Sequence, residues 1–279
     1  MTSASARLAW PYLLGLGLLV FVPATAAVVL AFTDFTGIQA PTFSGTDNLR
    51  RLLEDEAFWR ALGNSVIYVV IAVPLRLVAA VAVALVLHRR SFGTGSVRAV
   101  AFAPSIVPDA AWALLWLWLL NPLYGPLALA VGGVDFLTDP RAARIAIPVM
   151  SAFQIGEAFV IALAARSAIP RYLYESATIE GASPGFQLRR ITLPLMAPVI
   201  AILALRDVIV ALQVNFVPAL IVTEGGPRYA TTYLPLYIYR TAFRYFRFGY
   251  ASALSIALFV ITALVIFTQY RLAKRWRLL

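Results

Sequence analysis

Two long stretches of the chain carry no charged residue, and they determine the class of the protein. Residues 9–33 and 248–270 contain no Asp, Glu, Lys or Arg. Each is longer than the roughly 20 apolar residues that a helix needs to cross a bilayer. Backbone groups in lipid must form hydrogen bonds within their own segment, so such stretches are helical. The pattern predicts an all-α protein that crosses the membrane several times.

Further apolar segments bring the expected number of spans to six. We place them near 9–33, 61–87, 99–121, 144–165, 198–222 and 248–270, within one transmembrane domain of residues 1–279. Prolines interrupt several spans, which membrane helices tolerate because neighbouring groups bond the freed carbonyls. The first stretch is too long for the apolar region of a signal peptide, which has about 7–15 residues. We expect it to be retained as the first span.

The distribution of basic residues predicts the orientation. Cytoplasmic segments are enriched in Lys and Arg, and three segments qualify: the loop at 88–98, the segment at 166–197 and the tail. Their basic residues are Arg89, Arg90, Arg98, Arg166, Arg171, Arg189, Arg190, Arg271, Lys274, Arg275 and Arg277. Both termini are therefore expected on the cytoplasmic side. The opposite loops also contain arginine, so the bias is modest.

Composition excludes several other classes of protein. Hydrophobic residues make up 61% of the chain and charged residues only 13%, unlike a soluble domain. The net charge of +10 is spread over loops and span ends, which indicates membrane topology rather than nucleic-acid binding. Without cysteine there is no disulfide or thiol nucleophile. The one histidine, His88, is expected to be a solvated flank of a span, and no metal site or catalytic residue is predicted.

The segment at 166–197 is unusually polar for a position between two spans. Residues 171–180 favour a helix that Gly181 can end in a left-handed cap. Ser183 and Pro184 then suit the N-cap and first position of a second short helix, which ends at Arg189 and Arg190. Two short helices joined at a glycine would form a rigid protrusion. The alternative is an amphipathic helix lying among the lipid headgroups.

The same segment resembles the signature loop of ABC importer permeases. That loop reads Glu-Ala-Ala, three residues, Gly, nine residues, Ile, one residue, Leu-Pro. The chain has Glu175-Ser176-Ala177, Gly181, Ile191 and Leu193-Pro194 at this spacing, with Ser176 as the one departure. The stretch TEGGPRYATTYLPLYIYRTAF at 223–243 resembles the last outer loop of the carbohydrate-uptake branch. So do IPRYLYESA, FLTDP at 136–140, and Trp59 with Asn64-Ser65.

This resemblance implies a fold, a set of partners and a coupling surface. The expected fold is a type I ABC importer permease with six transmembrane helices, both termini inside and a cytoplasmic coupling loop. The helix at about 183–190 would sit in a groove of a cytoplasmic ATPase dimer. The other expected partners are a second permease, generally a different chain, and an extracytoplasmic sugar-binding protein. The expected coupling residues are Glu175, Ser176, Ala177, Gly181, Ser183, Pro184, Arg189, Leu193 and Pro194.

The resemblance also implies a transport subunit rather than an enzyme. The chain has no Walker-type Gly-x-x-x-x-Gly-Lys-Ser/Thr motif, so ATP and Mg²⁺ are expected on the partner ATPase and no cofactor on this chain. The expected cargo is a mono-, di- or oligosaccharide. Two alternatives are the same machinery importing glycerol phosphate or another small polar metabolite, and an ion-coupled secondary transporter. Secondary transporters commonly carry internal repeats, and none is visible here.

Polar side chains inside the spans are the candidates for contact with cargo. Sugars are bound by amides and carboxylates, so the expected substrate residues are Gln154, Glu157, Gln213 and Asn215. Gln213 and Asn215 are two positions apart and do not share a helix face, so we expect one of them to point into the cavity. The remaining charges inside the spans are Arg76, Asp109, Arg206 and Asp207. We expect Arg206 and Asp207 to neutralise one another or charges on other helices. An anionic cargo would recruit Arg76 or Arg206 instead.

Overall fold

A computed structural model of the chain describes residues 3–88, 93–132 and 134–275. These residues are helical apart from loops and one antiparallel pair of two-residue strands. Four helices are long and apolar enough to span a bilayer, or up to six if each of two bent helix pairs is one span. The predicted all-α membrane protein is confirmed. The predicted cytoplasmic residues Arg89, Arg90 and Arg277 lie outside the described residues.

The chain divides into two compact units. Unit 1 comprises the described residues of 1–60 and 234–261, and unit 2 those of 61–233 and 262–279. Unit 1 holds α1 (Ser3–Leu16), η1 (Gly17–Phe21), α2 (Val22–Leu30), β1 (Thr33–Asp34), β2 (Thr42–Phe43), α3 (Asp47–Glu54), α14 (Leu234–Phe243) and the first half of α15 (Phe248–Arg275).

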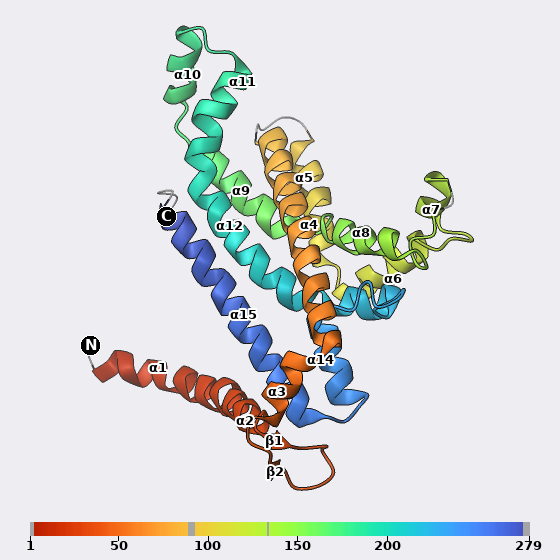
Figure 1. The fold of residues 1–279 in the computed structure, drawn as a ribbon. Helices are drawn as coiled ribbons and strands as arrows, with labels where there is room; N and C mark the ends of the chain where they lie inside the picture. The colour runs from red at the N-terminus through yellow and green to blue at the C-terminus, as the bar shows by residue number, and fades with distance from the viewer. Residues whose placement is uncertain (1–2, 89–92, 133, 276–279) are drawn as a thin grey trace. The chain divides into compact units, whose positions relative to one another are not determined.

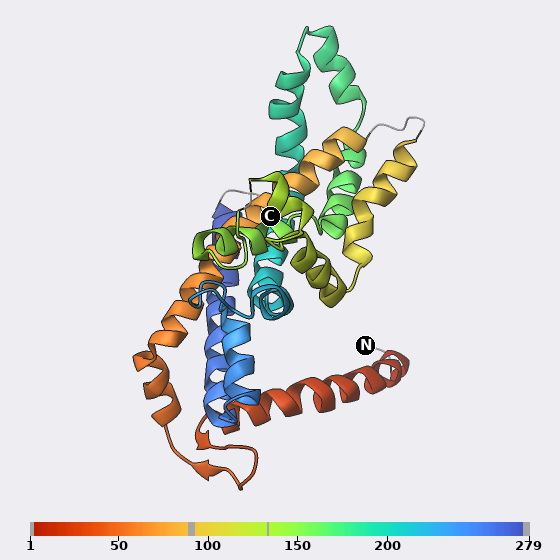
Figure 2. The same ribbon diagram turned by 90° about the vertical axis from the view of Figure 1, so that its right-hand side faces the viewer.

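Unit 2 holds most of α4 and the helices that follow it, up to the loop before α14 (Figure 1 and Figure 2). They are α4 (Glu56–Leu87), α5 (Thr94–Phe102), η2 (Ala103–Ile106), α6 (Asp109–Leu119), α7 (Pro126–Ala130), α8 (Pro140–Ser151), α9 (Gly156–Ala168), α10 (Tyr172–Ile179), α11 (Pro184–Gln187), η3 (Leu188–Thr192), α12 (Leu193–Val214), α13 (Phe216–Pro218) and η4 (Ala219–Thr223). The second half of α15 completes it.

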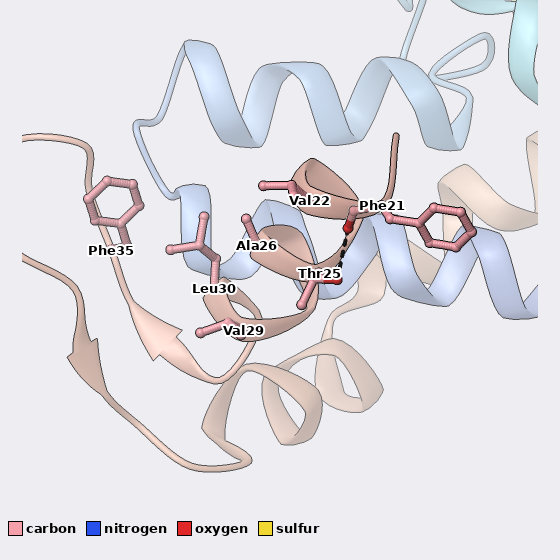
Figure 3. Close-up of a pocket in the computed structure, with 7 residues that line it drawn as sticks. All are labelled: Phe21, Val22, Thr25, Ala26, Val29, Leu30 and Phe35. Atoms are coloured by element: carbon pink, nitrogen blue, oxygen red, sulfur yellow. Dashed lines mark hydrogen bonds between the residues drawn. The ribbon is translucent and has the colours of Figure 1, made fainter. Parts of the chain in front are cut away.

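In unit 1, the first span is one helical run with a widened π turn, η1, in its middle. Pro23 is the second residue after this turn, and a proline ring clashes with the carbonyl four residues before it, which here belongs to Leu19 inside η1. The wider turn makes room for the ring. The apolar side chains of α2 and Phe35 line a shallow pocket of about 680 Å³, where the Thr25 hydroxyl bonds back to the Phe21 carbonyl (Figure 3). Such a surface suits lipid or an apolar protein face.

Unit 1 is tied together at Asp55, between α3 and α4. Its carboxylate accepts hydrogen bonds from the hydroxyls of Tyr237 and Tyr250, each at 2.5 Å, and from the backbone N–H of Ala57 at 2.9 Å. Burial raises the pKa of Asp55, but these hydrogen bonds to the charged form outweigh it, and the pKa is lowered. Asp55 therefore connects α3 to α14 and to the start of α15.

We expect Asp55→Ala to loosen unit 1 by about 2 kcal/mol, since hydrogen bonds to a charged group are lost. Amide hydrogen exchange of α3 and α14 would rise. The lowered pKa makes this contribution complete above the unfolded value of about 3.9, and it disappears as the pH falls through the folded value. The difference between the two proteins should therefore be present at pH 7 and shrink below about pH 4. In the control Glu54→Ala, an exposed pair with Arg50 is lost, and exchange should barely change. Equal exchange in both variants at pH 7 would contradict the assignment.

In unit 2, the predicted spans at 99–121 and 144–165 are bent pairs rather than single helices. The run ending in η2 meets α6 at 99°, because Val107 is extended before Pro108, as residues before proline tend to be. Helices α8 and α9 meet at 51°. There the backbone N–H of Gly156 bonds to the Ser105 hydroxyl at 2.7 Å. A Cβ at Gly156 would lie 2.6 Å from that hydroxyl, so the contact needs glycine.

The fifth span is part of a helical run of 40 residues from Pro184 to Thr223. The prediction of a separate short helix ending at Arg189 and Arg190 was therefore wrong. Arg189 and Arg190 lie within the π turn η3, which directly precedes Leu193 and Pro194, and the Leu193 N–H bonds to the Leu188 carbonyl. The widened turn relieves the clash of the Pro194 ring with the preceding turn.

A buried apolar core in unit 2 is formed by residues of α4, α9 and α12 and of the segments that flank α9. Four alanines, Ala80 and Ala84 of α4 and Ala158 and Ala162 of α9, lie among larger apolar side chains in this core. The buried set consists of Ala80, Val81, Ala84, Leu87, Ile155, Ala158, Phe159, Ala162, Ile169, Met196 and Leu203. This packing holds the base of the polar segment that follows α9.

Candidate functional site

The polar segment at 166–197 forms a helical hairpin, which we call the coupling segment. Gly181 has φ +79°, and the Ala182 N–H bonds to the Ala177 carbonyl at 2.8 Å, as in a Schellman C-cap. The Ser183 hydroxyl caps the next helix by accepting from the Phe186 N–H at 3.3 Å. The predicted glycine elbow and serine cap are confirmed. Helix α10 lies beside the α11–η3 run (Figure 1 and Figure 2).

A side-chain brace closes this hairpin. The Gln187 amide donates to the Thr178 hydroxyl at 3.0 Å and to the Ala182 carbonyl at 3.2 Å, across the elbow. Most of the expected coupling residues are exposed around it, namely Glu175, Ser176, Gly181, Ser183, Pro184, Arg189 and Pro194; Ala177 and Leu193 are partly buried. The segment therefore presents a braced, accessible surface.

Four charged side chains inside the spans form a linked network. Arg76 donates two hydrogen bonds to the carboxylate of Asp207, at 3.1 and 3.2 Å. Asp207 is 0% exposed and Arg76 15%. Arg206 lies 3.4 Å from the Asp207 carboxylate and also pairs with Glu157. The four formal charges cancel, which reduces the cost of placing them within the membrane. The expectation that Arg206 and Asp207 neutralise charge is confirmed.

The expected substrate residues fall in two places. Gln154 lies in the break between α8 and α9, and Glu157 is exposed in the first turn of α9, where it contacts Arg206. Gln213 is exposed near the end of α12, whereas Asn215 is 1% exposed. Neither amide atom of Asn215 has a hydrogen-bond partner among the described residues. The two amides thus differ in environment, as their spacing predicted.

The sequence did not reveal several contacts of this region. The partner of Asp207 is 131 residues away in the chain, and no local pattern links the two positions. His88 is not simply a solvated flank, because its ring is half-buried and lies 3.3 Å from Arg166. The buried side chain of Asn64 donates to the Tyr229 and Thr232 carbonyls, at 2.7 and 3.2 Å, and so ties α4 to the loop after η4. Within the described part of the chain, no group of three His, Cys, Asp or Glu residues could hold a metal ion.

Comparison with known proteins identifies the family. Residues 76–278 match the family described as the binding-protein-dependent transport system inner membrane component. The chain belongs to the binding-protein-dependent ABC importer permeases. The permease is 31% identical to the lactose transport system permease protein of Rhizobium radiobacter, over 90% of this chain and 88% of the relative. It is 34% identical to the trehalose/maltose transport system permease protein of Thermococcus litoralis, over 82% and 79%.

Solved structures agree on the fold. A bacterial ABC transporter involved in the import of the acidic polysaccharide alginate superimposes with a TM-score of 0.85 at 23% identity, covering 98% of the permease and 95% of that chain. The expected importer permease fold and the resemblance to the carbohydrate-uptake branch are confirmed. The permease is a multi-pass inner-membrane transport subunit and not itself an ATPase, and ATP is bound by a partner ATPase.

Proposed function

We propose that this permease forms, with a second permease chain, the pathway for a neutral sugar delivered by an extracytoplasmic binding protein. The observation that carries this proposal is the pairing of the intramembrane cations. Arg76 is bonded to Asp207, and Arg206 is paired with Glu157, so neither arginine is set aside for an anionic cargo. The lactose and trehalose/maltose names of the relatives support a sugar of one to several units.

The test is substrate-stimulated ATP hydrolysis by the complete importer. The permease would be reconstituted in liposomes with its second permease, its ATPase and its binding protein. We expect neutral mono-, di- or oligosaccharides to stimulate hydrolysis and to be taken up. Stimulation by glycerol phosphate, with none by neutral sugars, would replace the sugar proposal with the anionic cargo. Uptake driven by an ion gradient without ATP would overturn the importer mechanism itself.

Within this pathway we propose that Gln154, Glu157, Gln213 and Asn215 meet the cargo. Asn215 has the strongest structural support, because an amide buried without hydrogen bonds costs about 1–3 kcal/mol. The hydroxyls of a sugar could supply the missing partners. Gln213 and Glu157 are exposed and need no such compensation.

We expect Asn215→Leu to lower sugar uptake by roughly tenfold, the value of one good hydrogen bond. Basal ATP hydrolysis and assembly with the partners should be preserved. Gln213→Leu, near the end of the same helix, serves as the comparison, and a smaller effect there would assign the stronger cargo contact to Asn215. If Asn215→Leu leaves the uptake of every transported sugar unchanged, its amide joins helices and does not bind cargo.

We also propose that the coupling segment docks on the cytoplasmic ATPase. The capped and braced hairpin supports this, because a lever must keep its shape under load. Glu175 and Arg189 provide exposed charges of opposite sign for the partner. The second permease is expected to be a different chain, and purification of the native complex followed by mass spectrometry would identify it.

A further inference from the structure

A cavity of about 1210 Å³ lies at the base of the coupling segment. Its walls come from three places: the end of α4, the end of α9 and the coupling segment itself. The wall includes Leu85, His88, Arg166, Tyr174, Gln187 and Thr192. Beside the cavity these elements share apolar packing, because Leu87 and Ile169 belong to the buried cluster of unit 2 and Leu85 and Tyr174 pack against it. Around the cavity wall they are also joined by a series of polar contacts.

The first contact fixes the protonation state of His88. The Nδ1 atom lies 2.6 Å from the Leu85 carbonyl, and the Nε2 atom lies 3.3 Å from Nη2 of Arg166. A carbonyl only accepts hydrogen bonds and a guanidinium only donates them. Nδ1 therefore carries the proton, Nε2 accepts from Arg166, and the imidazole is neutral. His88 thus links the last turn of α4 to the end of α9.

The contacts continue from Arg166, at the end of α9, to α10 and η3. Its guanidinium carbon lies 4.4 Å from the centre of the Tyr174 ring, within the range of a cation–π interaction. The Tyr174 hydroxyl lies 2.9 Å from the hydroxyl of Thr192, which is buried and donates to the Gln187 carbonyl at 3.4 Å. Since the Thr192 hydroxyl has one hydrogen, it accepts from Tyr174. Gln187 in turn braces the elbow.

We propose that His88, Arg166, Tyr174 and Thr192 form a relay that sets the angle of the coupling segment against the ends of α4 and α9. The four are positioning residues, since they act through the coupling segment. This inference rests on the proposed coupling function. Without the relay, movement of the ATPase would tilt the coupling segment at the cavity. This movement would then not be transmitted to the spans.

The relay has a built-in dependence on pH. Protonated His88 would carry hydrogens on both ring nitrogens and could no longer accept from Arg166, which is itself positive. Among the described residues, the other charged groups near the cavity are Arg98, Arg171 and Glu175; the two cations oppose protonation of His88 and the carboxylate favours it. Arg98 of α5 donates to the Leu87 carbonyl at 3.1 Å and to the His88 carbonyl at 3.4 Å, and Arg171 and Glu175 line the same cavity. Acidification would therefore open the relay at His88.

The first experiment removes single atoms from the relay within the complete importer in nanodiscs. Tyr174→Phe deletes the hydroxyl that meets Thr192 and keeps the ring beneath Arg166. Tyr172→Phe is the matched control, because Tyr172 is 63% exposed on the same helix and lies outside the cavity wall. We expect Tyr174→Phe to retain the ATPase and basal hydrolysis, and to lose about fivefold to tenfold of the stimulation by the loaded binding protein. Tyr172→Phe should equal wild type.

A second experiment uses the pH profile, which a merely structural role of His88 would not change. Stimulated hydrolysis in wild type should fall when the pH is lowered enough to protonate His88. His88→Gln offers a donor and an acceptor without titrating, so it should keep stimulation and flatten this fall. If Tyr174→Phe fails to assemble, this profile decides alone.

Two results would overturn the relay: equal stimulation in Tyr174→Phe, Tyr172→Phe and wild type, or a His88→Gln profile identical to that of wild type. Failure of the proposed coupling function would give a different result, because the wild-type complex itself would then show no stimulation by any loaded binding protein. A relay failure leaves wild-type stimulation intact.

Discussion

Asp207→Ala is expected to prevent the permease from folding stably. Asp207 is fully buried, and its removal would leave the Arg76 guanidinium, itself only 15% exposed, without its two charge-assisted hydrogen bonds. Breaking a buried pair in this way costs about 3–5 kcal/mol. The whole stability of a domain is about 5–15 kcal/mol, so the loss is severe. The yield of monodisperse protein after extraction should fall sharply, and its thermal midpoint with it.

The matched control removes both partners of the buried pair. In Arg76→Leu/Asp207→Leu no charge is left buried and unpaired, and such replacements are often neutral or stabilising. Arg206 keeps its contact with Glu157 in the double variant. We therefore expect the double variant to recover most of the yield lost in Asp207→Ala. If Asp207→Ala matches wild type and the double variant is worse, the pair does not hold α4 and α12 together.

Gly181→Val is expected to uncouple the importer without unfolding the permease. The space around Gly181 is open, so a larger side chain meets no neighbour. The strain arises from the backbone alone, because φ +79° costs a β-branched residue about 1–2 kcal/mol. The elbow would open or straighten, and α11 would leave its docking position. Either the ATPase no longer co-purifies, or hydrolysis no longer responds to the loaded binding protein.

Gly93→Val separates backbone strain from position. Gly93 has φ +85° and equally open surroundings, but it caps α5 outside the coupling segment. The Gly93→Val variant should have a similar backbone strain and keep both ATPase binding and sugar-stimulated hydrolysis. Wild-type behaviour of Gly181→Val in both assays would reduce the coupling segment to a surface hairpin and remove the support for its docking role.

The parts of the permease that the sequence predicted are those encoded by neighbouring residues. Gly181 indicated a left-handed cap, and Ser183 with Pro184 indicated a helix start; both depend on positions within a few residues of each other. The long apolar stretches predicted spans for the same reason. The membrane restricts the backbone to helices, so length and hydropathy carry most of the information.

The parts that escaped prediction depend on tertiary contacts. The break before α9 requires the Ser105 hydroxyl, which is supplied from 51 residues away, and the partner of Asp207 is more distant still. His88 looked solvated because its local neighbours are arginines, while its ring actually meets α9. Arg189 and Arg190 indicated the end of a short helix, but the π turn that contains them continues directly into α12. The hydrophobic pattern of the sequence predicts neither these tertiary contacts nor the π turn.

The 40-residue helical run from Pro184 to Thr223, with a single turn residue at Asn215, fixes the rotational phase between its two ends. An α-helix turns by about 100° and rises about 1.5 Å per residue. One residue inserted between Leu195 and Leu212 would therefore swing the coupling surface a quarter-turn away from the face set by Asn215, while lengthening the run only slightly. The number of residues between the coupling segment and Asn215 is therefore a structural requirement in its own right, separate from the identity of the residues that fill the helix.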